Sequence, residues 1–296
     1  MQVLSIDIGG TTVKSALYRE DGSEIAVFPS EETAIVGGKQ QISEQVIALC
    51  QRVAQTHRLD GVAISSAGVI DPFRGEVVFA GPSIPGYSGT ALKIEVERAC
   101  ALPCAVENDV NAMALGEAWL GAAQGCDSAL CLTLGTGLGG AILLNGELWR
   151  GHQFSAGEIG HIPLAGGRRL EEDASTRAML RDYQVRSGEL IDGQAFFKRI
   201  EAGEAQAEAA LTHMLDALTT GLLAAVHLLS PQAIIIGGAV AAQSHILEPR
   251  IQSLLAARVS SALFMPEIVR CAALGNRAGQ IGALRWFLQS QADTHD

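Results

Sequence analysis

Positive charge is scarce in this chain. Its 21 lysines and arginines are outnumbered by 32 aspartates and glutamates, which leaves a formal net charge of −11. Nucleic acids and anionic membrane surfaces attract basic patches, so this balance argues against both as partners. It does not argue against a small anion, because backbone N–H groups at turns can bind phosphate without a charged side chain.

Long apolar runs and closely paired cysteines are missing as well. No run of about 18 apolar residues occurs, so no membrane-spanning helix is expected. The opening residues, "MQVLSIDIGG", carry no basic segment and no cleavage signal, and they favour a strand over a signal peptide. No CxxC pair occurs, and the cysteines stand in apolar or helical surroundings, which indicates reduced thiols in a cytoplasmic protein. They are Cys50, Cys100, Cys104, Cys126, Cys131 and Cys271.

The chain does have enough apolar material for two domains. Hydrophobic residues make up 48% and charged residues 18% of its 296 residues, as in folded globular proteins. A single core stops growing near about 250–300 residues, so two domains are expected. We place the first at residues 1–117, completed by a C-terminal helix at 280–296, and the second, with helical insertions, at residues 118–279.

One pattern occurs twice, with the copies about 125 residues apart. It consists of a strand, a glycine- and threonine-rich turn, a second strand, an Asx-Gly turn and a third strand. The predicted strands are Val3–Ile8, Lys14–Tyr18 and Glu24–Phe28 in the first copy, and Ser128–Leu134, Ala141–Leu144 and Glu147–Arg150 in the second. The repeat predicts an α/β protein built from two related halves.

Apolar spacing predicts the remaining elements. Helices are expected at Gln41–His57, Thr90–Ala101, Thr176–Ser187, Gly193–Ala202, Glu204–Leu229, Ile246–Ala257 and Gly275–Leu288. Two further strands are expected at Val62–Ser65 and Ala233–Ile236, and the glycines and prolines of Ala80–Tyr87 predict a loop.

The glycine turns predict a polyphosphate site. Glycine lets the backbone approach a ligand closely, and several N–H groups can then face one anion. A lone turn of this kind would indicate only a hairpin, but here two matched turns are joined by a third glycine pair ahead of a helix. Neither a P-loop nor a Rossmann fingerprint fits, because no GK[ST] occurs and the first two turns lead into strands. The expected phosphate ligands are Gly9, Gly10, Thr11, Thr12, Thr133, Gly135, Thr136, Gly137, Gly139, Gly237 and Gly238.

Two charged residues flank the first turn. Asp7 either satisfies local amides or holds Mg²⁺ through water beside the phosphates, since magnesium favours one or two carboxylates plus phosphate oxygens. Lys14 is either a further phosphate ligand or a solvated strand residue.

Several blocks of the sequence resemble one family in its order and spacing. "IDIGGTTVKSALY", "ENDVNAMALGEAWLG", "LTLGTGLGGAIL", "AGEIGHIPL" and "IIIGGAV" are similar to the signature blocks of the ROK family of bacterial sugar kinases. "WLG", "LCLTLGTGLGG" and "NGELWRG" point to its β-glucoside kinase and N-acetylmannosamine kinase-like branch. The resemblance implies a duplicated RNase H-like (actin/hexokinase-type) two-domain fold with a central cleft, and the use of ATP and Mg²⁺.

The resemblance also implies roles for single residues. Asp109 matches the general base that takes the proton from the sugar hydroxyl, a task that suits a positioned carboxylate. The matching sugar ligands are Ser66, Gly68, Asn108, Glu158, His161 and Glu172, where Glu171 is the alternative to Glu172. Glu107 matches the motif without an assigned role, and Asn111 and Glu117 are expected to be helix-surface or packing residues.

Two departures from the family pattern bear on the substrate. Most ROK kinases follow the GEIGH block with a cysteine cluster that binds zinc, whereas this chain has "IPLAGGRRLEEDASTRAML". A structural zinc needs four ligands, mostly Cys or His, so we predict no zinc site, and His161 is left for the sugar or a carboxylate. Ser83 stands near the place where many relatives have an asparagine.

The sequence therefore predicts an ATP-dependent kinase that phosphorylates glucose or a β-glucoside at its C6 hydroxyl. N-acetylmannosamine is the alternative substrate, the donor could be another nucleotide or polyphosphate, and a homodimer is expected from the family. A sugar-sensing regulator of the same family is a weaker interpretation. Those proteins carry an N-terminal helix-turn-helix, whereas here Met1 leads straight into the first predicted strand and the net charge is acidic. An actin- or chaperone-like ATPase would not need the Glu-Asn-Asp and GEIGH blocks.

Overall fold

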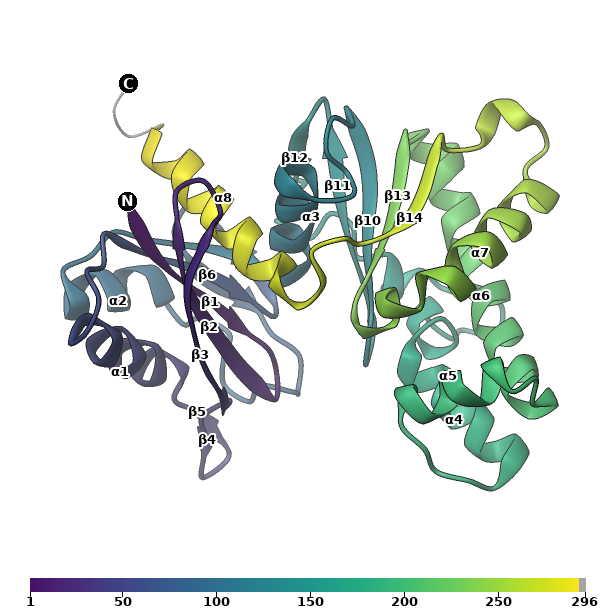
Figure 1. Ribbon diagram of the computed structural model, residues 1–296, viewed down its shortest axis with the longest axis horizontal. Helices are drawn as coiled ribbons and strands as arrows, with labels where there is room; N and C mark the ends of the chain where they lie inside the picture. The colour runs from purple at the N-terminus through teal and green to yellow at the C-terminus, as the bar shows by residue number, and fades with distance from the viewer. Residues whose placement is uncertain (293–296) are drawn as a thin grey trace. The chain divides into compact units, whose positions relative to one another are not determined.

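The computed structural model describes residues 1–292, which form two compact α/β units (Figure 1). The first unit contains residues 1–121, residues 151–155 and the described residues from 277 onward. The second contains residues 122–150 and 156–276. The last four residues of the helix expected at 280–296 lie outside the described residues.

Each unit contains a five-stranded sheet, and the two sheets have the same plan. The first has the strand order β3-β2-β1-β6-β9, and the second has β12-β11-β10-β13-β14. In each, an antiparallel three-stranded meander is followed by two parallel strands. This matched order confirms the repeat read from the sequence. The strands are β1 (Gln2–Ile8), β2 (Thr12–Arg19), β3 (Glu24–Glu32), β6 (Gly61–Ser66), β9 (Cys104–Asn108), β10 (Ser128–Leu134), β11 (Leu138–Leu144), β12 (Glu147–Trp149), β13 (Ala233–Gly237) and β14 (Ile268–Cys271).

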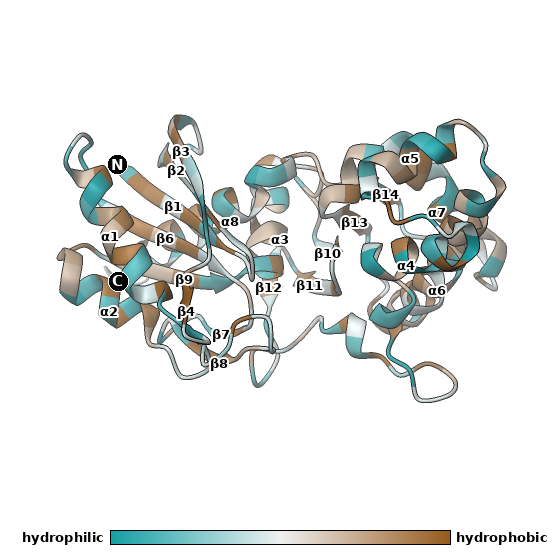
Figure 2. Cartoon of the chain, turned by 90° about the horizontal axis from the view of Figure 1, so that it is seen from below, coloured by the Kyte–Doolittle hydropathy of each residue, from teal (hydrophilic) through white to brown (hydrophobic). Residues whose placement is uncertain are grey.

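The first sheet is covered on both faces. Side chains alternate along a strand, so Leu4, Ile6 and Ile8 of β1 join the apolar core that also contains residues of α1 (Ile42–Ala54) and α2 (Leu92–Cys100). The alternate side chains face α8 (Ala278–Ala292), where Ser5 donates a 2.6 Å hydrogen bond to the carbonyl of Gln280. The strands β1 and β6 are brown in Figure 2, as expected for a sheet buried on two sides.

Helix α8 packs on α3 (Asp109–Leu120) at very short range. A Cβ at Gly282 would lie 1.5 Å from the carbonyl oxygen of Ala112, and one at Gly116 would lie 2.5 Å from that of Ala278. Only glycine permits backbones to approach this closely. The C-terminal helix is therefore an integral part of the first unit.

In the second unit, one apolar core joins the sheet to four helices. They are α4 (Thr176–Ser187), α5 (Gly193–Glu201), α6 (Ala205–Leu229) and α7 (Ser244–Arg258). Among residues 1–292, α6 is the one helix long and apolar enough to cross a membrane by composition, and 56% of its apolar window is buried within the protein. Its place in the core accounts for that composition.

Short elements account for most differences from the sequence-based prediction. Two small hairpins were not expected, β4 (Ile35–Val36) with β5 (Lys39–Gln40) and β7 (Val69–Asp71) with β8 (Glu76–Phe79), because such short strands carry little periodic pattern. Short 3₁₀ helices lie at η1 (Ile159–His161), η2 (Leu170–Glu172), η3 (Ala239–Gln243), η4 (Ala262–Phe264) and η5 (Gly275–Arg277). Consequently η3 separates the third glycine pair from α7, and α8 begins after η5.

Candidate functional site

Polar residues of the first unit gather where three parallel strands end. In the strand register, Ile8 of β1 lies beside Ser66 of β6, and Ser66 lies beside Asn108 of β9. The first glycine turn follows Ile8, and Asp109 follows Asn108. One edge of the sheet thus carries both the predicted phosphate turn and the predicted base.

The junction between β9 and α3 is held by the Asn108 side chain. Asn108 caps α3, because its Oδ1 accepts hydrogen bonds from the backbone N–H groups of Val110 at 2.9 Å and Asn111 at 3.0 Å. Its Nδ2 donates to the carbonyl of Gly68 at 2.8 Å and to Oδ1 of Asp109 at 2.9 Å. Asn108 therefore connects Asp109 to the turn after β6.

The first glycine turn is tight and lies against a second loop. The N–H of Gly9 donates to the carbonyl of Thr12 at 2.9 Å, and Thr33 donates through its hydroxyl to the carbonyl of Gly9 at 2.7 Å. A Cβ at Gly10 would lie 3.2 Å from Cβ of Ser83, so the loop at 80–87 touches this turn. Thr11 is exposed and Thr12 begins β2.

Asp7 stands just before this turn, part-buried between β6 and α8. Ser65 donates a 2.8 Å hydrogen bond to Oδ1 of Asp7, and a Cβ at Gly279 would lie 3.1 Å from the same oxygen. Lys14 is its partner on β2. Burial raises the pKa of Asp7, although the Ser65 hydrogen bond and Lys14 act in the opposite direction. A single carboxylate here fits a magnesium ion held through water, which needs few direct protein ligands.

Ser66 ends β6, but its side chain is buried. Its hydroxyl is fully buried and forms a 2.8 Å hydrogen bond with the hydroxyl of Tyr87, whose side chain is also fully buried. The side chain of Ser66 therefore faces Tyr87 and not solvent. It anchors the loop at 80–87, a link that the sequence analysis missed. Gly68, at φ +103°, is confined by the Phe79 carbonyl, 2.7 Å from a Cβ placed there.

The two glycine elements of the second unit lie side by side. Thr133 of β10 pairs with Gly237 of β13, and a Cβ at Gly238 would lie 2.2 Å from the carbonyl oxygen of Leu134. The turn itself is closed by the N–H of Gly135, which donates to the carbonyl of Gly137 at 3.0 Å, with Thr136 exposed at its tip. The sequence placed Gly139 in the turn, but it lies inside β11, opposite Thr133.

Glu158, His161 and Glu171 form a second polar group in this unit. The His161 Nε2 lies 3.8 Å from Oε2 of Glu158. A Cβ at Gly137 would lie 2.7 Å from Oε2 of Glu171, so this carboxylate lies against the glycine turn. Burial raises the pKa of Glu158, His161 opposes the rise, and the charge of Glu171 adds to it. Glu171 is thus close enough to Glu158 to affect its ionisation.

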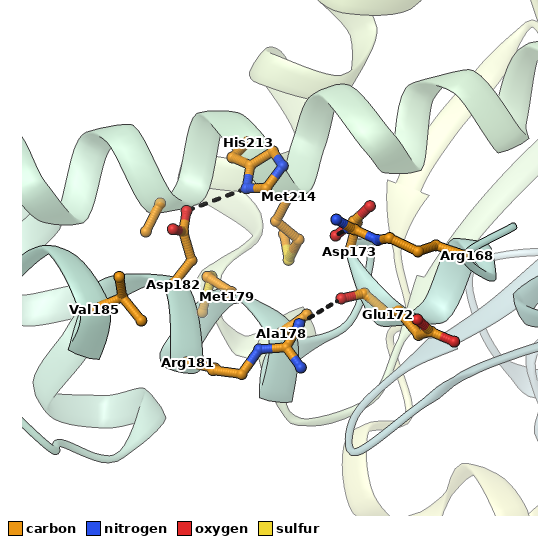
Figure 3. A pocket seen from close by; sticks show the side chains of 11 residues that line it. Arg168, Glu172, Asp173, Ala178, Met179, Arg181, Asp182, Val185, His213 and Met214 are labelled. Carbon is orange, nitrogen blue, oxygen red and sulfur yellow. Dashed lines mark hydrogen bonds and ion pairs between the residues drawn. The ribbon is translucent and has the colours of Figure 1, made fainter. Parts of the chain in front are cut away.

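Glu172 is one of the residues that line the pocket drawn in Figure 3. It pairs with Arg169 at 3.2 Å, which holds the pKa of Glu172 below its usual range. This pocket, of about 160 Å³ between α4 and α6, is also lined by Arg168, Asp173 and Arg181. Arg169 pairs with both carboxylates at 3.2 Å, but only Glu171 also lies against Gly137 and acts on the ionisation of Glu158.

Comparisons with known proteins agree with the expected family. The sequence model that describes the ROK family matches residues 3–290 of this chain. A β-glucoside kinase from Listeria monocytogenes is 34% identical over 301 residues, covering 98% of this chain and 99% of that protein. A glucokinase from Thermotoga maritima is 30% identical over 270 residues, covering 83% of this chain and 84% of that protein.

Solved structures agree as well. A ROK family glucokinase from Streptomyces griseus, in complex with glucose and AMPPNP, matches with a TM-score of 0.86 and 29% identity, covering 98% of this chain and all of that one. The expected duplicated α/β fold and the expected class of enzyme, an ATP-dependent sugar kinase with an alcohol acceptor, are confirmed. The chain belongs to the ROK family.

Proposed function

We propose that this sugar kinase transfers the γ-phosphoryl group of ATP to the C6 hydroxyl of glucose or a β-glucoside. The observation that carries the proposal is the shared strand edge of the first unit, where Ile8, Ser66 and Asn108 lie in one register row. Phosphoryl transfer needs an acceptor hydroxyl and a phosphate held close together, and this edge carries a candidate group for each.

In the proposed reaction, Asp109 accepts the proton of the acceptor hydroxyl. The C6 oxygen attacks the γ-phosphorus, the bond to the β–γ bridging oxygen breaks, and ADP leaves. The carboxylate of Asp109 is oriented by the 2.9 Å hydrogen bond from Asn108 Nδ2. The backbone N–H groups of the glycine turns would stabilise the phosphate charge as it moves to the bridging oxygen.

The proposed sugar ligands are revised by the positions of three side chains. Glu171 takes the role given to Glu172, because it lies beside Glu158 and Gly137. Glu158, His161 and the backbone of Gly68 remain proposed ligands of sugar hydroxyls. The side-chain amide of Asn108, expected to be a sugar ligand, is occupied by four hydrogen bonds within the protein, so its proposed role becomes the orientation of Asp109. Ser66 becomes a supporting residue.

The proposed reaction uses a magnesium ion, which Asp7 would hold through water. The ion would neutralise charge on the donor's phosphates. Lys14, beside Asp7, is proposed as a second source of positive charge. We also propose a cytoplasmic homodimer without nucleic-acid or membrane partners, in keeping with the acidic charge.

A coupled kinase assay over glucose, cellobiose, N-acetylmannosamine, N-acetylglucosamine, allose and fructose tests the substrate. We expect the highest kcat/KM with glucose or cellobiose and MgATP. A preference of more than about tenfold for N-acetylmannosamine, equivalent to about 1.4 kcal/mol, would reject the proposed substrate but not the kinase.

A further inference from the structure

Glu107 is a carboxylic acid without contact to solvent. Its side chain is fully buried at the end of β9, two residues before the proposed base. Carboxylates are seldom buried completely unless they are paired or hydrogen-bonded, because removing the charge from water is costly. A side chain in this position cannot touch a sugar or a nucleotide, so any effect on the reaction must pass through its neighbours.

The neighbours of Glu107 are the residues that hold Asp109. Oε1 of Glu107 accepts hydrogen bonds from the backbone N–H of Asn108 at 2.9 Å and from Nδ2 of Asn111 at 3.0 Å. The backbone N–H of Asn111 donates in turn to Oδ1 of Asn108 at 3.0 Å. Glu107, Asn108 and Asn111 therefore form a closed ring of hydrogen bonds.

This ring continues directly into the proposed active site. Asn108 Nδ2 reaches Oδ1 of Asp109 and the carbonyl of Gly68. With two accepted and two donated hydrogen bonds, the Asn108 amide uses its full capacity. The ring therefore fixes the orientation of the Asn108 amide, and the amide in turn orients the Asp109 carboxylate through its Nδ2 hydrogen bond.

We propose that Glu107 is a positioning residue that acts through Asn111 and Asn108 to hold the Asp109 carboxylate in its reactive orientation. The proposal rests on the proposed role of Asp109 as base. Removing the Glu107 carboxylate leaves the Asn111 amide, which is 4% exposed, without its acceptor. Restoring that bond requires the start of α3 to shift, and a displacement of about 1 Å at a catalytic group can lower turnover about 100-fold.

The test compares four variants of the full chain: Glu107→Ala, Glu107→Gln, Asn111→Ala and Glu117→Ala. Glu117 is the matched control, because it is also a fully buried acid and lies on α3 with Asn111, but it is not one of the three residues of the ring. For each variant, kcat and KM are measured per folded molecule, with the folded fraction taken from circular dichroism and gel filtration.

We expect Glu107→Ala and Asn111→Ala to lower kcat about 100-fold while KM for ATP changes less than about threefold. Glu107→Gln should keep kcat within about fivefold, because its amide oxygen can accept the same two hydrogen bonds. Glu117→Ala should lower the melting temperature and leave kcat per folded molecule nearly unchanged.

The proposal is overturned if Asn111→Ala or Glu107→Ala keeps kcat within about threefold of the wild type, or if Glu117→Ala loses as much kcat as they do. If Glu107→Ala does not fold, Asn111→Ala decides by the same limit, and a Glu107→Gln enzyme that loses as much kcat as Asn111→Ala would also count against the hydrogen-bonding role of Glu107. Asp109→Asn separates the two proposals. If the Asp109→Asn enzyme is active, the proposed role of Asp109 as base is rejected. If it is inactive while the ring variants stay active, only the proposed role of Glu107 is rejected.

Discussion

The hydroxyl of Ser65 donates a 2.8 Å hydrogen bond to Oδ1 of Asp7, in the space left by Gly279 at the start of α8. Burial raises the pKa of Asp7 and so disfavours its charged form. The Ser65 hydrogen bond and the charge of Lys14 act in the opposite direction. Perturbed carboxylates of this kind are common at functional sites.

Asp7→Asn should lower turnover and weaken its dependence on magnesium, while making the fold more stable at neutral pH. The pKa of Asp7 in the fold lies above its ordinary value of 3.8, so ionisation there costs stability. The cost is absent below the ordinary pKa and appears as the pH rises through the raised pKa. Urea unfolding near about pH 3.5 and at about pH 7 should show an advantage for the variant only at the higher pH. An unchanged magnesium response would assign Asp7 to structure alone.

Asp109→Asn should lower kcat by about 10²–10⁴-fold and change the KM for sugar only a few-fold, because an amide cannot accept the proton. Asp192→Asn is a matched control, since Asp192 caps α5 in the second unit through a 2.8 Å bond to the N–H of Ala195. Steady-state kinetics with both substrates make the comparison. Turnover of Asp109→Asn within tenfold of the wild type would exclude the carboxylate as base.

The sequence allowed the frame of the fold and much of the site to be predicted. Alternating apolar residues, Asp21-Gly22 and Asn145-Gly146 located both meanders, because these are local signals. The link between Ser66 and Tyr87 and the approach of Gly279 to Asp7 depend on packing between distant segments, which local patterns do not encode. Glu171 and Glu172 could not be separated, because a short 3₁₀ turn sends adjacent side chains in different directions.

Glu171→Gln should move the acid limb of the sugar-binding pH profile to lower pH. The negative charge of Glu171 raises the pKa of Glu158, so its removal lets Glu158 ionise at a lower pH. Glu172→Gln serves as the control, because Glu172 pairs with Arg169 and does not affect Glu158. The measurement is KM for sugar between about pH 4 and 8. A larger displacement with Glu172→Gln would return the proposed role to Glu172.

Tyr87→Phe and Ser66→Ala should each raise KM for sugar. Ser66→Ala leaves the Tyr87 hydroxyl buried without this partner, at a cost of about 1–3 kcal/mol. Tyr87→Phe should be milder, because the Ser66 hydroxyl keeps its 3.2 Å hydrogen bond to the carbonyl of Ala67. The double variant should be less impaired than the sum of the two, since both partners are then removed. Kinetics and thermal unfolding on the same preparations test this. Strict additivity would show that the hydrogen bond does not anchor the loop.

Metal analysis of the purified protein should find no stoichiometric zinc, and a zinc-selective chelator should leave activity unchanged when Mg²⁺ is kept in excess. The segment after His161 offers no cysteine, and one histidine is too few for a structural zinc site. One zinc per chain after dialysis would contradict this ligand count.

The position of α8 has a consequence for how the chain is made. One face of the first sheet is covered by a helix that is synthesised last, after the whole second unit. At a typical synthesis rate of about 5–20 residues per second, the N-terminal half waits about ten to thirty seconds on the ribosome with that face bare. With β1 and β6 uncovered on that face, the partly synthesised chain is prone to aggregate. The second unit also has time to fold before the first is complete. Chaperone dependence during translation should therefore fall on the N-terminal half of this enzyme.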